Sequence, residues 1–160
     1  MSFSVVINSN NAFVSNSAKN QNQYLINWDG FPDHKYKMSF DFCSTVSGLS
    51  SAFNTTLRTF CIISIDGLPS LNYTAGSSYN SVPTQQIGVA HWEVRPTQTG
   101  SVLNSGILFC SVIDNPPLFL PYKPSSNILT VRLFRTNGLS LNERFALTDY
   151  VLRLHFTPID

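Results

Sequence analysis

The feature that most constrains the fold is the alternation in the last hydrophobic stretch, residues 150–156. Large apolar side chains occupy every second position there, at Tyr150, Leu152, Leu154 and Phe156. A period of two is the signature of a β-strand with one buried face. Such a face must be covered by a second layer, so we expect this strand to lie centrally in one of two packed sheets. Thr157-Pro158 is expected to end the strand, because proline removes a donor from the ladder.

Other stretches carry the same signature, with alternating or β-branched apolar residues between turn signals. They are residues 24–28, 36–42, 57–65, 68–73, 86–95, 107–113 and 129–133. Residues 3–7 could add one more strand, Asp66-Gly67 marks a turn, and residues 43–56 are expected to form a loop. No stretch has the pattern of an amphipathic helix of about ten residues or more.

The chain is therefore predicted to be all-β, as an eight-stranded single jelly-roll sandwich of two packed sheets. Its 160 residues suit one domain. We expect this domain to span residues 24–160, after a polar N-terminal strand or arm over residues 1–23. The segment Asn8–Gln23 is rich in Asn, Ser and Gln. That composition favours an arm that is flexible or ordered by a partner.

Two of the predicted strands, Leu57–Ile65 and Ile107–Ile113, are apolar on both sides. In a jelly roll counted from the strand at residue 24, they become neighbours in one sheet. Because the outer face of each sheet in a sandwich meets water, we expect the arm or another subunit to cover them. Leu118–Leu120 is either a partner contact or a loop that closes one end. The candidate subunit interface comprises Phe60, Ile62, Ile107, Phe109, Leu118, Phe119 and Leu120.

The surface is predicted to be poor in charge. Charged residues make up 12% of the chain, against about 25% in an average domain. Either long Ser- and Asn-rich loops or coverage by partner molecules accounts for this, since interface cores are depleted of charge. The net charge is +1 and the basic residues are scattered, so we do not expect nucleic-acid binding. No apolar run approaches the roughly 18 residues that a membrane span requires.

The cysteines indicate a reducing compartment. The N-terminus lacks the basic and long apolar regions of a signal peptide. Cys43, Cys61 and Cys110 are an odd number, and each lies in an apolar strand pattern. We expect them to be buried free thiols that pack as small hydrophobic residues.

One enzyme-like pattern is present, His91-Trp92-Glu93 with the distant His155. It is similar to the facial triad of non-haem iron oxygenases. Strand alternation turns these side chains away from the core, whereas an iron triad must converge inside a barrel. We therefore expect no catalytic residue, metal or cofactor.

A second alternative is a glycan-binding sandwich, such as a lectin or an adhesin head. Aromatic side chains provide the stacking platforms that sugar rings use. The candidates are Trp28, Tyr73, Tyr79, Trp92 and Tyr122. Their positions in the sequence do not bring them together.

The chain begins with an Asn- and Ser-rich arm that runs into residues 22–28, continues with the strand at 36–42 and closes with 150–160. This pattern resembles the single jelly-roll capsid proteins of icosahedral double-stranded DNA viruses, their minor capsid and penton proteins. The resemblance spans the whole chain. It implies a structural protein of a virion shell, made in the host cytoplasm and working without a cofactor. Such a protein would assemble as a ring or trimer and contact other capsid proteins.

Overall fold

The computed structural model describes residues 1–15, 21–47, 60–68, 86–93, 105–110, 115–135 and 147–159. In these ranges the chain is all-β apart from the short 3-10 turn η1 (Ser9–Asn11), and no helix is long and apolar enough to cross a membrane. The strands are β1 (Phe3–Asn8), β2 (Val14–Ser15), β3 (Gln21–Leu25), β4 (Lys35–Ser47), β5 (Phe60–Asp66), β6 (Gly88–Glu93), β7 (Ser105–Cys110), β8 (Leu118–Leu120), β9 (Ile128–Arg135) and β10 (Leu147–Ile159).

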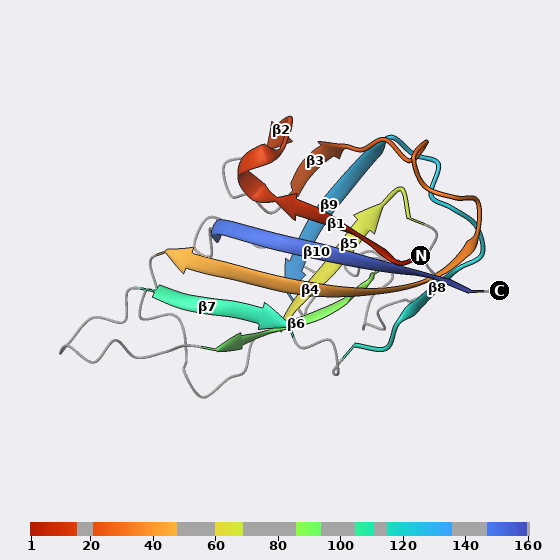
Figure 1. Cartoon of the computed structure of the whole chain (residues 1–160). Coiled ribbons are helices and arrows are strands. Elements are labelled where there is room, and N and C mark those ends of the chain that lie inside the picture. Colours follow the sequence, from red (N-terminus) through yellow and green to blue (C-terminus); the bar gives the residue numbers. More distant parts are fainter. Residues whose placement is uncertain are drawn as a thin grey trace, which may run out of the picture.

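The strands form two antiparallel sheets, which pack as two layers (Figure 1). One layer has the order β1-β10-β4-β7, and the short strand β8 pairs with the first part of β4. The other layer has the order β6-β5-β9-β3, and β2 extends it beyond β3. Pairing between β6 and β7 joins the two layers along one side.

The closing strand β10 lies between β1 and β4, as its alternation predicts. The four apolar side chains of residues 150–156 are each 1% exposed or less. The expected end at Thr157-Pro158 is wrong, because β10 continues to Ile159 and Pro158 pairs with Tyr36. Pairing with β1 stops at Phe156, so Pro158 has a neighbouring strand on one side only. That is the kind of position where a strand tolerates proline.

Aromatic side chains close one end of the core around Phe156. Its ring centroid lies 4.9 Å from that of Phe3, 5.7 Å from Trp28 and 6.1 Å from Tyr36. The Trp28 indole Nε1 donates to the Ser126 carbonyl at 2.8 Å, so its one polar group is satisfied inside the core. Strand β1 and the segment before β4 therefore pack on the same residue of β10.

The other end of the core contains a polar cluster. The Tyr24 and Tyr150 hydroxyls lie 2.8 Å apart, and the Asn22 side-chain amide donates to Tyr150 at 2.7 Å. Burial raises the pKa of Tyr24, and its hydrogen bonds to Tyr150 and Asn22 oppose that shift. Ser9 Oγ accepts from the Tyr150 backbone N–H at 3.0 Å. This cluster ties β3 of one layer to β10 of the other.

The N-terminal residues are part of this packing. Residues 3–7 form a strand, as expected, and Ile7 belongs to the core. Within the segment Asn8–Gln23, predicted to be an arm, Ser9 and Asn22 are buried. The expected boundary after residue 23 falls inside β3. Polar composition suggests an arm, but hydrogen bonds to Tyr150 allow these polar side chains to be buried.

Three further expectations from the sequence are wrong. The strand runs to Ser47, so residues 43–47 are not in a loop, and Cys43 is exposed instead of buried. Continued alternation beyond Phe42 places Cys43 on the outer face.

Strands β5 and β7 are not neighbours either, because β6 lies between them. Residues 57–59, 69–73, 94–95 and 111–113 of the predicted strands lie outside the described residues, and so do the side chains of Cys61 and Cys110.

Gly88 on β6 packs directly against the ring of Phe40, which extends from β4. A Cβ atom built on Gly88 would overlap both Asn115 Oδ1 and the ring of Phe40. Asn115 is 8% exposed, and its amide bonds both backbone groups of Val89, accepting from N–H at 2.8 Å and donating to the carbonyl at 2.9 Å. The absence of a side chain at residue 88 allows this close packing.

We predict that Gly88→Ala lowers the free energy of unfolding by about 1–3 kcal/mol or more, the usual cost of overpacking a core. Gly30→Ala is the matched control, since a Cβ there meets nothing within 4 Å. Urea denaturation followed by circular dichroism measures both changes. Equal stability of the two variants would show that β6 does not pass as close to Phe40 as described.

Candidate functional site

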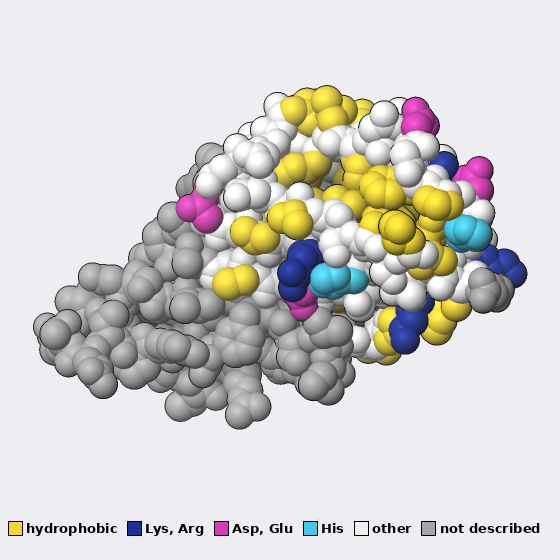
Figure 2. Space-filling view, in the orientation of Figure 1, with side chains coloured by type: hydrophobic (Ala, Val, Ile, Leu, Met, Phe, Trp, Pro, Cys, Tyr) yellow, Lys and Arg dark blue, Asp and Glu magenta, His cyan; other side chains and the backbone are white. Residues whose placement is uncertain are grey.

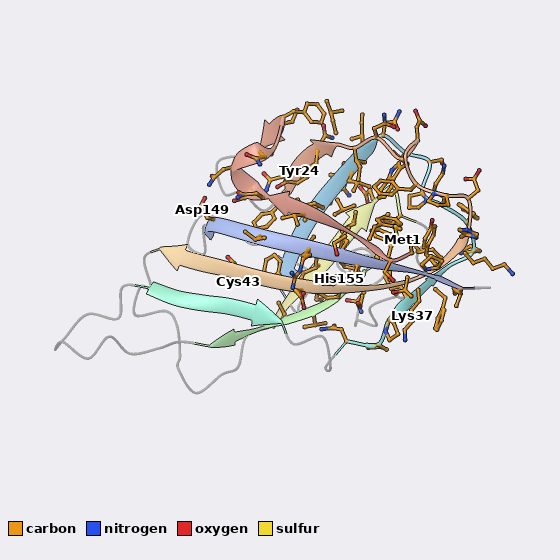
Figure 3. The ribbon with its side chains drawn as sticks, in the orientation of Figure 1. Met1, Tyr24, Lys37, Cys43, Asp149 and His155 are labelled. Carbon is orange, nitrogen blue, oxygen red and sulfur yellow. The ribbon has the colours of Figure 1, made fainter. Side chains whose placement is uncertain are left out.

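A hydrogen-bonded polar cluster lies on the outer face of the sheet β1-β10-β4. It consists of Ser4 on β1, Arg153 and His155 on β10, and Asp41 on β4. Strand alternation turns all four away from the core, and the register pairs Ser4 with His155 and Arg153 with Asp41. Figure 2 shows cationic, acidic and histidine side chains together on this face, and Figure 3 labels His155 there.

The four side chains form a continuous chain of contacts. Ser4 Oγ lies 2.9 Å from His155 Nδ1, and His155 Nε2 lies 2.8 Å from Asp41 Oδ2. The Arg153 guanidinium donates to the same Asp41 oxygen at 2.7 and 3.1 Å. When Nε2 donates to the carboxylate, the other nitrogen of the neutral ring accepts from the serine hydroxyl.

The carboxyl group of Asp41 is the electrostatic centre of the cluster. Partial burial raises its pKa, but the hydrogen bonds and charges of His155 and Arg153 outweigh this and hold the pKa below its ordinary value. The side chains of Asp41 and His155 are 34% and 33% exposed. Water therefore screens the contacts, and each contributes no more than about 1 kcal/mol.

Ser, His and Asp are also the residue types of a nucleophilic triad. In a triad the buried carboxylate stabilises the imidazolium that forms during the reaction. Here Arg153 shares Asp41 Oδ2 with His155 and compensates the negative charge. The arrangement is instead that of cross-strand polar pairs, which fix neighbouring strands to one another. We interpret the cluster as a link that holds β1 on β10 and β4.

The enzyme-like pattern seen in the sequence is not brought together by the backbone. His91 and Glu93 lie on β6, which two strands, β7 and β4, separate from β10. The register aligns His91 with Phe109, Cys43 and Val151, and Val151 is four residues along β10 from His155. Only the backbone of His91 and Glu93 is described, whereas the His155 side chain is hydrogen-bonded to Asp41. Among the described residues, no three His, Cys, Asp or Glu side chains form a group that could hold a metal ion.

The residues expected to form a subunit interface lie in different environments. Ile62, Leu118 and Leu120 are buried within the single chain, with 5% exposure or less. Phe119 is 63% exposed and lies beside Lys37 on the outer face of β4. Phe60, Ile107 and Phe109 lie on β5 and β7, where only the backbone is described. Burial of Ile62 therefore requires no partner, and an interface stays a prediction.

Other exposed apolar residues surround the polar cluster. Val6 is 63% and Val151 41% exposed, and Val151 pairs with the exposed Cys43. With Phe119, they are exposed apolar side chains on an outer face that also carries the polar cluster. Alternation in the sequence places each of them outward, but only the pairing of β1, β10, β4 and β8 places them on one surface.

A hollow of about 350 Å³ lies at one end of the sandwich, where the segment before β4 meets the loop after β8. Lys123 connects the two segments, because its Nζ lies 3.0 Å from Asp33 Oδ1 and donates to the Phe31 carbonyl at 3.1 Å. Tyr36 donates its hydroxyl to the Pro32 carbonyl at 2.6 Å, and burial raises the pKa of Tyr36. The residues that line the hollow are Asp33, His34, Lys35, Pro121, Tyr122 and Lys123.

Of the aromatic residues proposed as sugar platforms, Trp28 is buried and Tyr122 is 59% exposed at this hollow. Trp92 is described by its backbone alone, and Tyr73 and Tyr79 lie outside the described residues. The sequence patterns did not identify Ser4 or Asp41 as members of a cluster, nor the contacts of Lys123 with Asp33 and the Phe31 carbonyl. No sequence signal could have joined them, because each contact depends on which strands or loops meet in space.

A scan against models of protein families and a search of curated proteins found no match for this chain.

We predict that Asp41→Asn lowers the free energy of unfolding at pH 7 by about 0.5–1 kcal/mol, the range of partly exposed ion pairs. Because the folded-state pKa of Asp41 is lowered, its contribution is present above the unfolded pKa of about 3.9 and is lost as the pH falls through the folded value. The difference between the variant and the wild type should therefore become smaller at pH 2 than at pH 7. Urea denaturation at both pH values measures it.

Asp29→Asn is the control for this experiment, because Asp29 lies in an exposed turn away from the cluster. We expect its effect to be small and equal at both pH values. An Asp41→Asn effect that is absent at pH 7, or unchanged at pH 2, would contradict the assigned role of the carboxylate.

Proposed function

We propose that the chain is a single jelly roll that serves as a structural subunit of a viral capsid, as a minor capsid or penton protein without catalytic activity. The observation that carries this proposal is the strand order. Jelly-roll strands B to I pair as B-I-D-G in one sheet and C-H-E-F in the other. The orders β1-β10-β4-β7 and β3-β9-β5-β6 support this arrangement if β1 is strand B.

This assignment accounts for the incorrect neighbours expected from the sequence. If the strand at residue 24 is given the letter B, as the sequence analysis expected, β5 becomes strand D, which pairs with strand G in a jelly roll. Counting from β1 makes β5 strand E and β7 strand G, in different sheets, in agreement with β6 lying between them. The shift by one strand arises because the N-terminal segment belongs to the sheet and was predicted to be an arm.

A fold is shared by many functions, so the surface must support the functional part of the proposal. The chain is poor in charge, at 12%. On the outer face of the sheet β1-β10-β4, Val6, Val151 and Phe119 are 41–63% exposed. Exposed apolar side chains on a chain that is poor in charge suit contacts with other shell subunits, either copies of this chain or other capsid proteins.

Strand β1 offers a specific route for assembly. It stands at the end of the strand order, and no described strand pairs with its outer edge. Its residues 3–8 include neither a charged residue nor a proline, which proteins commonly use to keep an edge strand from pairing. An edge strand of this kind can pair with a strand of another subunit through backbone hydrogen bonds. We propose this contact as one interface of a ring or trimer.

We predict that the wild-type chain forms a discrete oligomer and that Val6→Lys shifts it toward the monomer, because a charge on the exposed edge strand opposes pairing. Leu25→Lys is the matched control, as Leu25 is 69% exposed on β3 of the other sheet. Light scattering measures the mass, and circular dichroism confirms the β fold of each variant.

A wild type that stays monomeric, or a Val6→Lys variant that associates like the wild type, would overturn the proposed contact. The capsid role has its own test, which is mass spectrometry of the proteins in purified virus particles. Absence of the chain from particles produced by cells that express it would remove that role.

A further inference from the structure

The hollow between residues 33–35 and 121–123 has the properties of a small binding site. Its volume of about 350 Å³ falls within the range of ligand sites, roughly 300–1,000 Å³. It lies at the loop end of the sandwich, and its lining does not include Val6, Val151 or Phe119, the exposed residues named for assembly. Its function therefore does not depend on the proposed capsid role.

The walls of the hollow are held in place before any ligand binds. Lys123 bridges the two loops through Asp33 and the Phe31 carbonyl, and its side chain is only 20% exposed. The Tyr36 hydroxyl fixes the Pro32 carbonyl of the first loop. Preorganised walls reduce the ordering cost of binding, so a shallow site can still bind a small ligand.

The hollow combines one exposed aromatic ring with hydrogen-bonding groups. Tyr122 is 59% exposed and follows Pro121, so together they provide an apolar wall. The Asp33 side chain is 89% exposed, and its carboxylate can accept hydrogen bonds from hydroxyl groups. An aromatic platform beside hydroxyl acceptors is the chemistry that recognises a sugar ring, with its apolar face and polar edge.

The charged side chains that line the hollow favour an acidic sugar over a neutral one. Asp33 balances the charge of Lys123, whereas Lys35 is exposed and makes no ion pair with a described residue. The exposed His34 also lines the hollow and adds a further hydrogen-bonding group. One uncompensated ammonium group favours a ligand with a carboxylate. A purely ionic ligand such as phosphate would make no use of the Tyr122 wall.

We propose that this hollow binds an acidic saccharide, with the sugar ring on Tyr122, the ligand carboxylate at Lys35 and the sugar hydroxyls at Asp33. The site is part of the native chain and requires no other component. Its affinity is expected in the millimolar range typical of a contact with few atoms.

The test titrates the full chain with sialyllactose and, as the neutral counterpart, with lactose, and follows NMR shifts of the protein. We expect sialyllactose to bind more tightly than lactose. Tyr122→Ala should weaken sialyllactose binding about three- to tenfold. Lys35→Gln should remove the preference for the acidic sugar. Phe119→Ala and Lys37→Gln are the controls, an exposed aromatic and an exposed lysine on the outer face, and should bind like the wild type.

Absence of binding to either sugar would overturn the proposal. It would also be overturned by binding that Tyr122→Ala leaves unchanged, or by equal binding of sialyllactose and lactose. Inorganic phosphate in a third titration separates a simple anion site from a saccharide site: binding of phosphate as tight as that of sialyllactose would contradict the sugar assignment. Tyr122 and Lys35 are exposed, so the variants are expected to keep the β spectrum of the wild type.

Discussion

Burial of one face of β10 is the constraint on which the other elements depend. Four alternating side chains of this strand are excluded from water, and each contributes about 1.5–3 kcal/mol by its burial. No single neighbour could cover them. Aromatic rings from β1, β4 and the segment between β3 and β4 surround Phe156, and the Tyr24 hydroxyl and the Asn22 amide bond the Tyr150 hydroxyl. The two layers are therefore held together at both ends of the same strand.

The outer side of β10 organises the opposite surface. Arg153 and His155 extend from it to Asp41 and Ser4, so three neighbouring strands are connected across their polar face. These contacts are screened by water and add little stability individually. Their effect is on position, because they hold the N-terminal strand β1 at the edge of the sheet. An edge strand kept in this place is what the proposed assembly requires.

The proposed functions occupy separate parts of the sandwich. The edge of β1 and the outer face around Val6 and Val151 are proposed to contact other subunits. The two loops joined by the ion pair between Lys123 and Asp33 form the hollow at one end. This division follows from the architecture, since two packed sheets leave only edges, outer faces and connecting loops for contacts. A variant at one of these places can therefore be tested without disturbing the others.

Local sequence patterns predict the all-β class, the buried face of residues 150–156 and the turn at Asp66-Gly67, where Gly67 has φ of 98°. Alternation and turn chemistry are local, so they can be recognised in a single chain. Which strands are neighbours follows only from tertiary packing, and so does the burial of Asn22 against Tyr150. Ser4 and His155 are 151 residues apart in sequence. Their contact depends on packing of the whole chain, because a period of two assigns a side chain to a face without naming the strand beside it.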